Sequence, residues 1–312
     1  MKTPIRARQA AAIFAVLLLS TTAHAVGLFR AYVASDGNDA NPCTLAQPCR
    51  LLPAALAAVA DGGGIWMLDS ANYNTSTVNI TKSVTILAIP GAVGSVLAIG
   101  GPAISVTTGG ISVAVRNLVI TQLPGGGGTD GISMVANSAL AVENSVFENL
   151  AYSGVYAAGT GVVAVTESVF RGIQGYAIFL ENGMRAQVAG TRMLQNTAGV
   201  HAKAAGAVIT RATLTDCIIS ASVYAVHSYA ENAGASAAIS ITRSTIANSG
   251  TALRAESVST GAAEVIIGSS QVHKSGYRWQ VLGGTAAVAS YGNNQFLDYA
   301  ASIGSLTLIG LE

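Results

Sequence analysis

The sequence has few charged residues, few aromatic residues and only three cysteines. Asp, Glu, Lys and Arg make up 10% of the 312 residues, aromatic residues make up 6%, and the formal net charge is +1. No run of Lys and Arg follows the N-terminal region, which argues against nucleic acid or an anionic membrane surface as a partner. Beyond that region, Gly, Ser, Thr or Asn interrupts every apolar run before it reaches membrane-spanning length. The 35 glycines favour a repetitive β architecture with many tight turns.

Residues 1–25 have the pattern of an export signal. Residues 2–8 hold three basic side chains, residues 10–19 are apolar, and residues 23–25 read Ala-His-Ala, a cleavage pattern of small residues. A membrane anchor is the alternative, but this apolar segment is shorter than the roughly 20 residues that a spanning helix needs. We therefore predict a secreted or periplasmic protein that begins at Val26 and has no membrane span. Its 13 Lys and Arg against 15 Asp and Glu give a net charge of −2.

The three cysteines fall into a close pair and a single residue. Cys43 and Cys49 flank a short loop-like segment, and in an oxidising compartment we expect them to form a disulfide. A metal-binding pair is the alternative, but no His or further Cys lies nearby in the sequence. Cys217 lies beside a predicted strand, where we expect a buried and unreactive thiol.

A short pattern of polar or small residues followed by apolar residues recurs along the chain. Its copies end at residues 120, 147, 170, 194, 219, 246, 272 and 296, which are spaced by 23–27 residues. A second motif lies between the copies, a Gly or Ala followed by an apolar residue, as in Gly131-Ile132 and Gly199-Val200. Each unit holds about three short strands and cannot bury its own apolar face, so the units must stack into a solenoid. The residues expected to point inward include Val146, Phe147, Val169, Phe170, Ile219 and Ile246.

This spacing distinguishes a parallel β-helix from two other all-β folds. A β-sandwich should show two-residue Asn-Gly or Asp-Gly hairpin turns, which the chain mostly lacks. Propeller blades need about 40 or more residues, more than one of these units contains. We predict an N-terminal cap over residues 26–83, stacked coils over 84–300 and a closing strand within 301–312. A short helix over Pro53–Ala60, stopped by residues 61–64, would cover the N-terminal end of the core.

The start of the mature chain resembles a known family. Residues 31–42 carry a Tyr-Val pair and a Gly-x-Asp-x-Asn-Pro stretch, followed by Pro48, the predicted helix and the apolar residues 65–68. This order is similar to the opening of many secreted bacterial β-helix proteins of the pectate-lyase-like fold group. The resemblance implies a right-handed parallel β-helix over nearly the whole mature chain. It does not imply an activity, because this fold carries lyases, hydrolases, tailspikes and inert surface proteins.

Period-two alternation from the Gly/Ala motif predicts which residues point outward on one sheet. The first outward column contains aromatic residues, two histidines and Arg254, and it would end at Arg278 in the last coil. The second column lies two residues further along each strand. It contains Glu and Lys and would end at Gln280. Aromatic rings suit sugar rings, and Lys and Arg suit uronate carboxylates. The alternative is a solvated face whose side chains simply pair with one another. The candidate binding residues are Tyr156, Phe179, Glu181, His201, Lys203, His227, Tyr229, Arg254 and Glu256.

Two catalytic patterns can be compared with these columns. The segment 128–132 and the strand at 199–203 are similar to parts of polygalacturonases, but the Asp pair and Gly-His-Gly of that family are absent. Inverting hydrolysis needs two carboxyl groups across the bond, and only Asp130 remains, so this activity is disfavoured and a turn role is expected for Asp130. A Ca²⁺-dependent lyase is also disfavoured, because the sequence has no adjacent pair of acidic residues of the kind that such a calcium site needs. Asp36, Asp39 and Asn41 are a possible Ca²⁺ loop, but turn capping is the commoner role of such residues.

Three functions therefore remain. We favour an exported protein that contacts extracellular or envelope polysaccharide through this face, without a metal or other cofactor. A metal-independent uronate lyase on the same face is the first alternative, with Lys203, His201, His227, Tyr229 or Arg254 as base or charge stabiliser. A structural or adhesive surface rod without a glycan site is the second.

Overall fold

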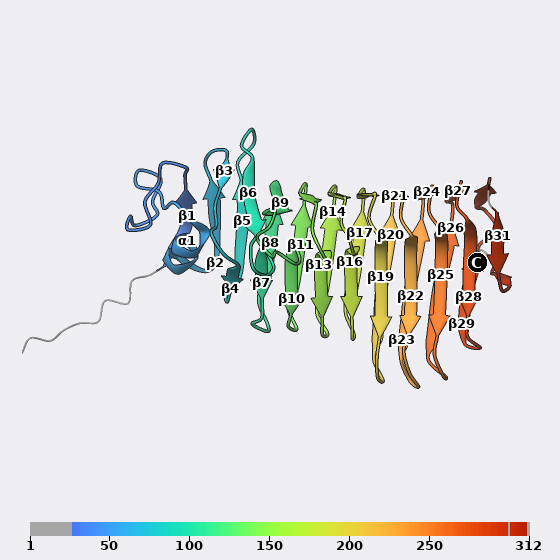
Figure 1. Ribbon diagram of the computed structural model, residues 1–312. Helices are drawn as coiled ribbons and strands as arrows, with labels where there is room; N and C mark the ends of the chain where they lie inside the picture. The colour runs from blue at the N-terminus through green and yellow to red at the C-terminus, as the bar shows by residue number, and fades with distance from the viewer. Residues whose placement is uncertain (1–26, 299, 311–312) are drawn as a thin grey trace, which may run out of the picture.

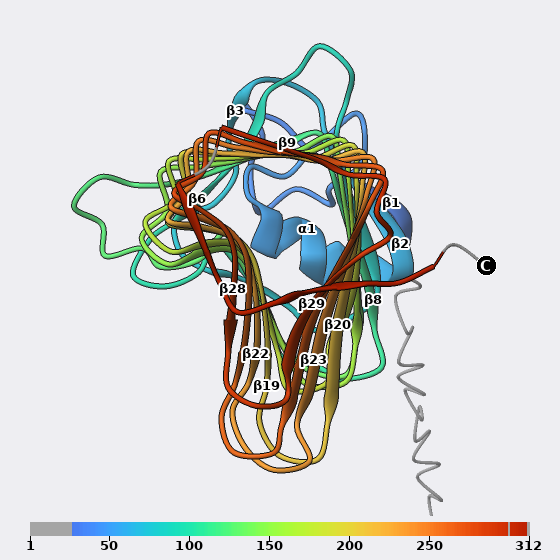
Figure 2. The ribbon, with the colours of Figure 1, turned by 90° about the vertical axis from the view of Figure 1, so that its right-hand side faces the viewer.

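The computed structural model of the protein describes residues 27–298 and 300–310. The predicted export signal over residues 1–25 lies outside the described residues. The chain winds through stacked coils into an elongated rod, with the N-terminal cap at one end and the last strands at the other (Figure 1). Each full coil contributes one strand to each of three parallel sheets, here called A, B and C, which enclose a continuous core (Figure 2).

The three sheets contain 12, 10 and 10 strands in the described part of the chain. Sheet A consists of β1 (Leu28–Val33), β2 (Val59–Met67), β5 (Val84–Ala88), β8 (Ser112–Arg116), β11 (Ala139–Glu143), β14 (Val162–Thr166), β17 (Arg185–Ala189), β20 (Ile209–Thr215), β23 (Ser236–Thr242), β26 (Ala262–Gly268), β29 (Ala286–Ser290) and β32 (Leu306–Leu308). Sheet B consists of β3 (Ala71–Asn72), β6 (Gly94–Ala98), β9 (Leu118–Gln122), β12 (Val146–Glu148), β15 (Val169–Arg171), β18 (Arg192–Leu194), β21 (Ile218–Ser220), β24 (Thr245–Ala247), β27 (Gln271–His273) and β30 (Gln295–Leu297). Sheet C consists of β4 (Val78–Ile80), β7 (Ile104–Val106), β10 (Ile132–Val135), β13 (Ser153–Ala158), β16 (Tyr176–Glu181), β19 (Ala198–Ala204), β22 (Tyr224–Ala230), β25 (Thr251–Ser257), β28 (Tyr277–Leu282) and β31 (Ala301–Ile303).

The polar part of the repeated pattern forms the corner between sheets A and B. Asn117, Asn144 and Asp216 have positive φ there, a conformation that Asn and Asp tolerate better than most side chains. The next residue points inward and links neighbouring coils: the Ser145 amide, for example, donates to the Ser168 hydroxyl over 3.2 Å. Cys217 occupies the equivalent place, where it is buried and free, and burial raises the pKa of its thiol. This explains an isolated cysteine as one position in a ladder of small polar side chains.

The core consists of side chains from equivalent positions of successive coils. Phe147 and Phe170 lie on adjacent strands of sheet B, are fully buried, and stack with ring centroids 4.6 Å apart. Ile219 and Ile246 are also fully buried, as the repeat predicts. The prediction was wrong for the residues just before the two phenylalanines.

Val146 and Val169 are only half-buried. Each directly precedes an inward-pointing phenylalanine on the same strand, and adjacent residues of a strand point to opposite faces. The repeat pattern did not separate the two members of each apolar pair.

The N-terminal end of the core is covered by α1 (Leu52–Ala58), which buries Leu52, Ala55 and Leu56 (Figure 2). The helix starts one residue before the predicted position and ends two residues early. Val59 has extended backbone and begins β2, which pairs with both β1 and β5. The predicted stop at residues 61–64 therefore lies inside a strand. A Cβ atom at Gly63 would lie 2.8 Å from the Phe29 carbonyl oxygen, so glycine is needed there for the approach of β1.

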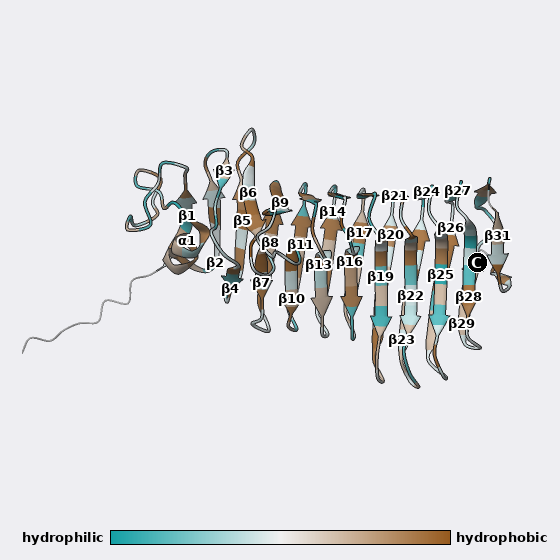
Figure 3. Cartoon of the chain, in the orientation of Figure 1, coloured by the Kyte–Doolittle hydropathy of each residue, from teal (hydrophilic) through white to brown (hydrophobic). Residues whose placement is uncertain are grey.

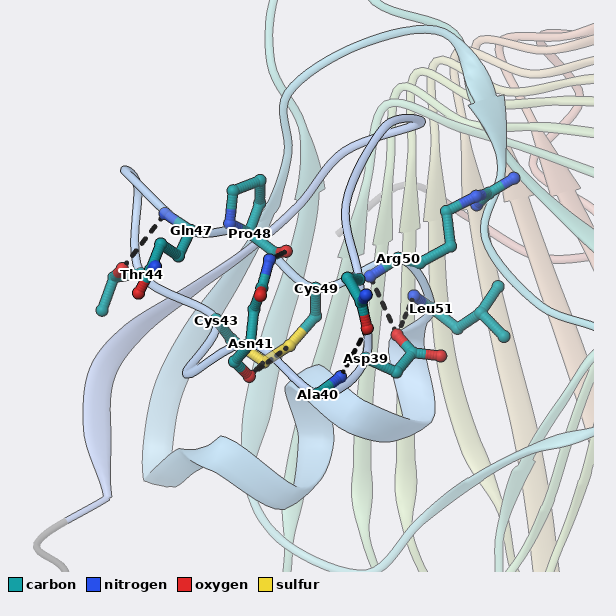
Figure 4. Close-up of a disulfide and its surroundings, with 11 residues drawn as sticks. Asp39, Ala40, Asn41, Cys43, Thr44, Gln47, Pro48, Cys49, Arg50 and Leu51 are labelled. Atoms are coloured by element: carbon teal, nitrogen blue, oxygen red, sulfur yellow. Dashed lines mark hydrogen bonds between the residues drawn. A yellow bond between two sulfur atoms is a disulfide. The ribbon is translucent and has the colours of Figure 1, made fainter.

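The loop before α1 is held by the predicted disulfide between Cys43 and Cys49, both of which are buried (Figure 4). Asp39 Oδ1 accepts hydrogen bonds from the amides of Arg50 and Leu51, each over 2.8 Å (Figure 4). Asp39 thus orients the chain just before the helix through amides 11 and 12 residues away, which is a longer-range role than the turn capping expected from the sequence. At the other end of the rod, the region 301–310 holds two short strands, β31 and β32, which extend sheets C and A.

Candidate functional site

The candidate side chains lie on the outward face of sheet C, in two columns set by the strand register. In the first column, Tyr156 is followed on successive strands by Phe179, His201, His227 and Arg254, each in register with the residue before it. Two residues further on, Glu181 is followed by Lys203, Tyr229 and Glu256 on successive strands. The nine candidate residues therefore occupy neighbouring positions from β13 to β25.

The register departs from the prediction at the last coil. Gln280, not Arg278, pairs with Arg254, and Leu282 pairs with Glu256. The cause is Trp279, which is 8% exposed and takes the inward position opposite a buried leucine. The sequence motif had assigned that inward position to the residue two places earlier, so the predicted columns were wrong at β28.

The N-terminal half of this face is a group of packed aromatic rings. The Tyr156 and Phe179 ring centroids lie 5.3 Å apart, and Phe179 lies 4.9 Å from the His201 ring. Tyr176 contacts both neighbours, with its ring centroid 4.8 Å from that of Phe179 and 5.0 Å from that of His201. The sequence prediction missed Tyr176.

The reason is a local break in the strand alternation. Ala177 and Ile178 are both fully buried, so Tyr176 and Phe179 share a face although three positions separate them. Tyr224 stands at the same offset before His227, with ring centroids 5.7 Å apart. A tyrosine three residues before a first-column residue therefore occurs twice, and this sequence signal could have located Tyr176 and Tyr224 on the face.

A cleft of about 270 Å³ opens beside the aromatic rings. It is lined by Asp130, Ser153, Gly175 and the side chains of Tyr152, Tyr156, Tyr176 and Phe179. Tyr152 is 62% exposed and lies at the corner between sheets B and C. Burial raises the pKa of Asp130, although hydrogen bonds with Ser153 and Thr129 oppose the change. Asp130 thus contributes a partly buried side chain to the lining of an aromatic cleft.

The C-terminal half of the face is more polar, and Figure 3 shows hydrophilic colour toward the C-terminal ends of β19, β22 and β25. Lys203 Nζ lies 3.2 Å from Glu181 Oε1 and 3.1 Å from Glu231 Oε2. Partial burial alone would lower the pKa of Lys203, but hydrogen bonds to Glu231 and Glu181 outweigh it and raise the pKa. The Tyr156 hydroxyl donates to the second oxygen of Glu181 over 2.8 Å. Glu181 therefore joins the aromatic and charged halves.

A second network surrounds Glu256. Arg254 donates to Glu256 Oε2 from Nε over 3.0 Å and from Nη2 over 2.7 Å, and to Gln280 Oε1 from Nη1 over 3.1 Å. Its guanidinium also lies 4.9 Å from the Tyr224 ring centroid. His227 Nε2 lies 3.2 Å from the same Glu256 oxygen. A carboxylate only accepts hydrogen bonds, so His227 carries its proton on Nε2.

Both histidines are weak bases in this environment. His201 is 5% exposed, and burial, with a smaller effect of His227, lowers its pKa to about 3. Burial, followed by the charge of Arg254, lowers the pKa of His227 to about 3 as well. His201 Nδ1 is buried and has no hydrogen-bond partner among the described residues. At neutral pH the two rings are therefore uncharged members of the aromatic ladder.

Within residues 27–298 and 300–310, no three His, Cys, Asp or Glu side chains gather closely enough to hold a metal ion. The same part of the chain contains no helix with the length and hydropathy of a membrane span.

Comparison with known proteins identifies the family. The family described as "Right handed beta helix region" matches residues 59–236 and, in an overlapping match, residues 102–301. The chain belongs to this family. The predicted fold, a right-handed parallel β-helix with one short N-terminal helix, is thereby confirmed. A sequence comparison with curated proteins gave no match.

Solved structures with the same fold include a pectate lyase, a lacto-N-biosidase and a protein in complex with xylose. Pectate lyase Pel9A matches with a TM-score of 0.69 and 15% identity, over 89% of this chain and 78% of that chain. XylC in complex with xylose matches with a TM-score of 0.64 and 9% identity, over 84% and 68% of the two chains. A GH136 lacto-N-biosidase from Eubacterium ramulus matches with a TM-score of 0.51 and 11% identity, over 90% and 68%. At these identities the likeness establishes a shared right-handed β-helix fold.

Proposed function

We propose that this protein binds a polysaccharide chain along the outward face of sheet C. The observation that carries the proposal is a cleft whose lining combines four aromatic residues with Asp130. Aromatic rings present flat apolar surfaces to the C–H faces of sugar rings, while their hydroxyl groups remain available for hydrogen bonds. The saccharide-related names of the similar structures agree with a glycan ligand.

The charges on this face favour neutral sugar units. Lys203 is already shared between Glu181 and Glu231, and Arg254 is held by Glu256 and Gln280. A uronate carboxylate would have to displace one of these internal partners and approach the remaining carboxylates. Neutral hydroxyl groups can instead add hydrogen bonds at the edges of the network without breaking it.

Binding is better supported than cleavage by a lyase reaction. A catalytic base needs a pKa near the working pH. Hydrogen bonds to two glutamates keep Lys203 protonated, and the pKa of about 3 makes His201 and His227 weak bases. Arg254 is engaged with Glu256 and Gln280, and a guanidinium offers only hydrogen-bond donors. Four of the five side chains that the lyase hypothesis offers, all but Tyr229, are therefore held in contacts within the protein.

We also propose that the protein acts outside the cytoplasm. The export signal predicted for residues 1–25 and the disulfide between Cys43 and Cys49 support a secreted or periplasmic location, where disulfides form and persist.

The test is a binding panel of neutral oligosaccharides, measured by isothermal titration calorimetry with the mature protein. Tyr152→Ala combined with Tyr176→Ala should weaken binding at least about tenfold, because two stacking surfaces are removed. Tyr291→Ala, which removes a tyrosine outside the cleft, is the matched control and should retain binding. Equal affinity of the wild type and the double variant would refute the site. Release of unsaturated, ultraviolet-absorbing products from any saccharide would refute binding without cleavage.

A further inference from the structure

The outward face of sheet A carries a hollow of about 740 Å³, larger than the cleft on sheet C. Its lining comes from seven neighbouring strands, β2, β5, β8, β11, β14, β17 and β20. At a strand spacing of about 4.8 Å the hollow extends for about 30 Å along the rod. It is therefore long enough for a chain molecule of several units.

The floor of this groove is flat and apolar over most of its length. Ala114, Ala141 and Ala164 are paired on successive strands and point outward beside Ala139 and Val162. Because these side chains are short, they extend little beyond the backbone of the sheet, and the surface is concave there. Sugar rings can lie on such a floor with their C–H faces against the alanine methyl groups.

The floor ends at two arginines that lie directly beside each other. Arg185 and Arg211 are paired in register on β17 and β20, and both are exposed. Their strands also bring Gln187 and Thr213 into register on the same face. Among the described residues, neither guanidinium has a hydrogen bond or a carboxylate within ion-pair distance. No Asp or Glu belongs to the lining of the groove.

This arrangement differs from that of three other exposed arginines of the rod. Arg116 faces Glu143, Arg171 faces Glu148 and Arg243 faces Asp216, each across neighbouring coils. Like charges directly opposite each other in a sheet are destabilising. A local violation of this kind points to a functional site, because a bound anion relieves the repulsion.

We propose that the groove on sheet A is a second glycan site, in which Arg185 and Arg211 hold a carboxylate of an acidic polysaccharide. Two adjacent guanidinium groups provide several N–H donors that match the geometry of a carboxylate. Gln187 and Thr213 supply further hydrogen bonds to the same sugar unit. This inference does not rest on the proposed binding face of sheet C.

The charge pattern also selects the kind of acidic chain. The cations occupy one end of the groove, and the lining from β5 to β14 contains no charged side chain. A nucleic acid carries a phosphate on every unit and would leave most of them unmatched. The groove instead suits a polysaccharide with carboxylates on some of its units and neutral rings between them.

The probe is a xylo-oligosaccharide substituted with glucuronic acid, compared with its carboxyl-reduced form. We expect the wild type to bind the acidic form more tightly and the difference to shrink as salt is added. Arg185→Gln combined with Arg211→Gln should weaken binding of the acidic form at least about tenfold, equivalent to the loss of one charged hydrogen-bond pair. Both arginines are exposed, and circular dichroism should confirm an unchanged fold.

Matched variants separate this site from general charge effects and from sheet C. Arg192→Gln removes an exposed arginine on sheet B and should change the affinity less than twofold. Tyr152→Ala with Tyr176→Ala alters only the sheet C cleft and should leave binding of the acidic form in place. Retained affinity in the double arginine variant overturns the proposal. Equal binding of the carboxyl-reduced form, or loss of acidic binding in the tyrosine variant, also overturns it.

Discussion

The groove on sheet A and the outward face of sheet C belong to the same rod, yet their charged side chains are arranged in opposite ways. On sheet C, Lys203 and Arg254 each contact a carboxylate, and the histidines between them are neutral. On sheet A, Arg185 and Arg211 lie side by side with no carboxylate in the groove that they line. A charged side chain that is internally paired stabilises the fold, whereas one left unpaired remains available to a ligand. The number of charges on a face is therefore a poorer guide to binding than their pairing.

The two faces share one core, so a core substitution should damage both. Phe147→Ala removes a fully buried ring that stacks on Phe170 and should reduce the free energy of unfolding by about 3–5 kcal/mol. Chemical denaturation measures this loss. Val146→Ala, the outward neighbour, is the control and should cost less than about 1 kcal/mol. A comparable loss in both variants would contradict the observed strand register.

Removing a charge from sheet C should destabilise the protein. Glu256→Gln removes the carboxylate that accepts hydrogen bonds from Arg254 and His227, and we expect a loss of about 1–3 kcal/mol in the free energy of unfolding. Glu264→Gln makes the same substitution on the outward face of sheet A, where it should cost less than about 0.5 kcal/mol. Equal values for the two variants would remove the distinction between the faces.

The histidines of sheet C should make stability depend on pH. Their pKa of about 3 in the folded protein lies below the unfolded value near 6.5, so the unfolded chain binds protons more readily. Stability should therefore fall as pH decreases from about 6.5 toward 3, by up to about 1.4 kcal/mol per pH unit for each histidine. His201→Phe should reduce the slope, and Arg211→Gln should not. A wild-type curve that is flat between pH 6.5 and 4 would contradict neutral buried histidines.

The smallest effect is expected for a charge removed from sheet A. Arg211→Gln should change the free energy of unfolding by less than about 0.5 kcal/mol and, if anything, raise it, because the repulsion from Arg185 disappears. Thermal unfolding at low salt is the most sensitive measurement. A loss above 1 kcal/mol would mean that Arg211 stabilises the fold through an internal partner.

The sequence by itself determined the coil. A repeat of 23–27 residues and the Gly/Ala motif predicted three short strands per unit and the order of Phe179, His201 and His227 along one sheet. These features are local, since the strand period decides which side chains point outward. The sequence prediction was wrong at β28, because the motif contained two candidate apolar residues and the larger ring of Trp279 took the inward position.

Only the tertiary structure decided which charges meet and where the surface is hollow. Tyr176 joined the aromatic group because two consecutive buried residues changed the alternation before Phe179. The pairing of Arg254 with Glu256 and the isolation of Arg185 from any acidic neighbour depend on side-chain placement across coils about 25 residues apart in sequence. The groove on sheet A depends on seven strands together. A single alanine in the sequence gives no sign of a binding surface. The alanines form a continuous surface only because the parallel strands stack in register.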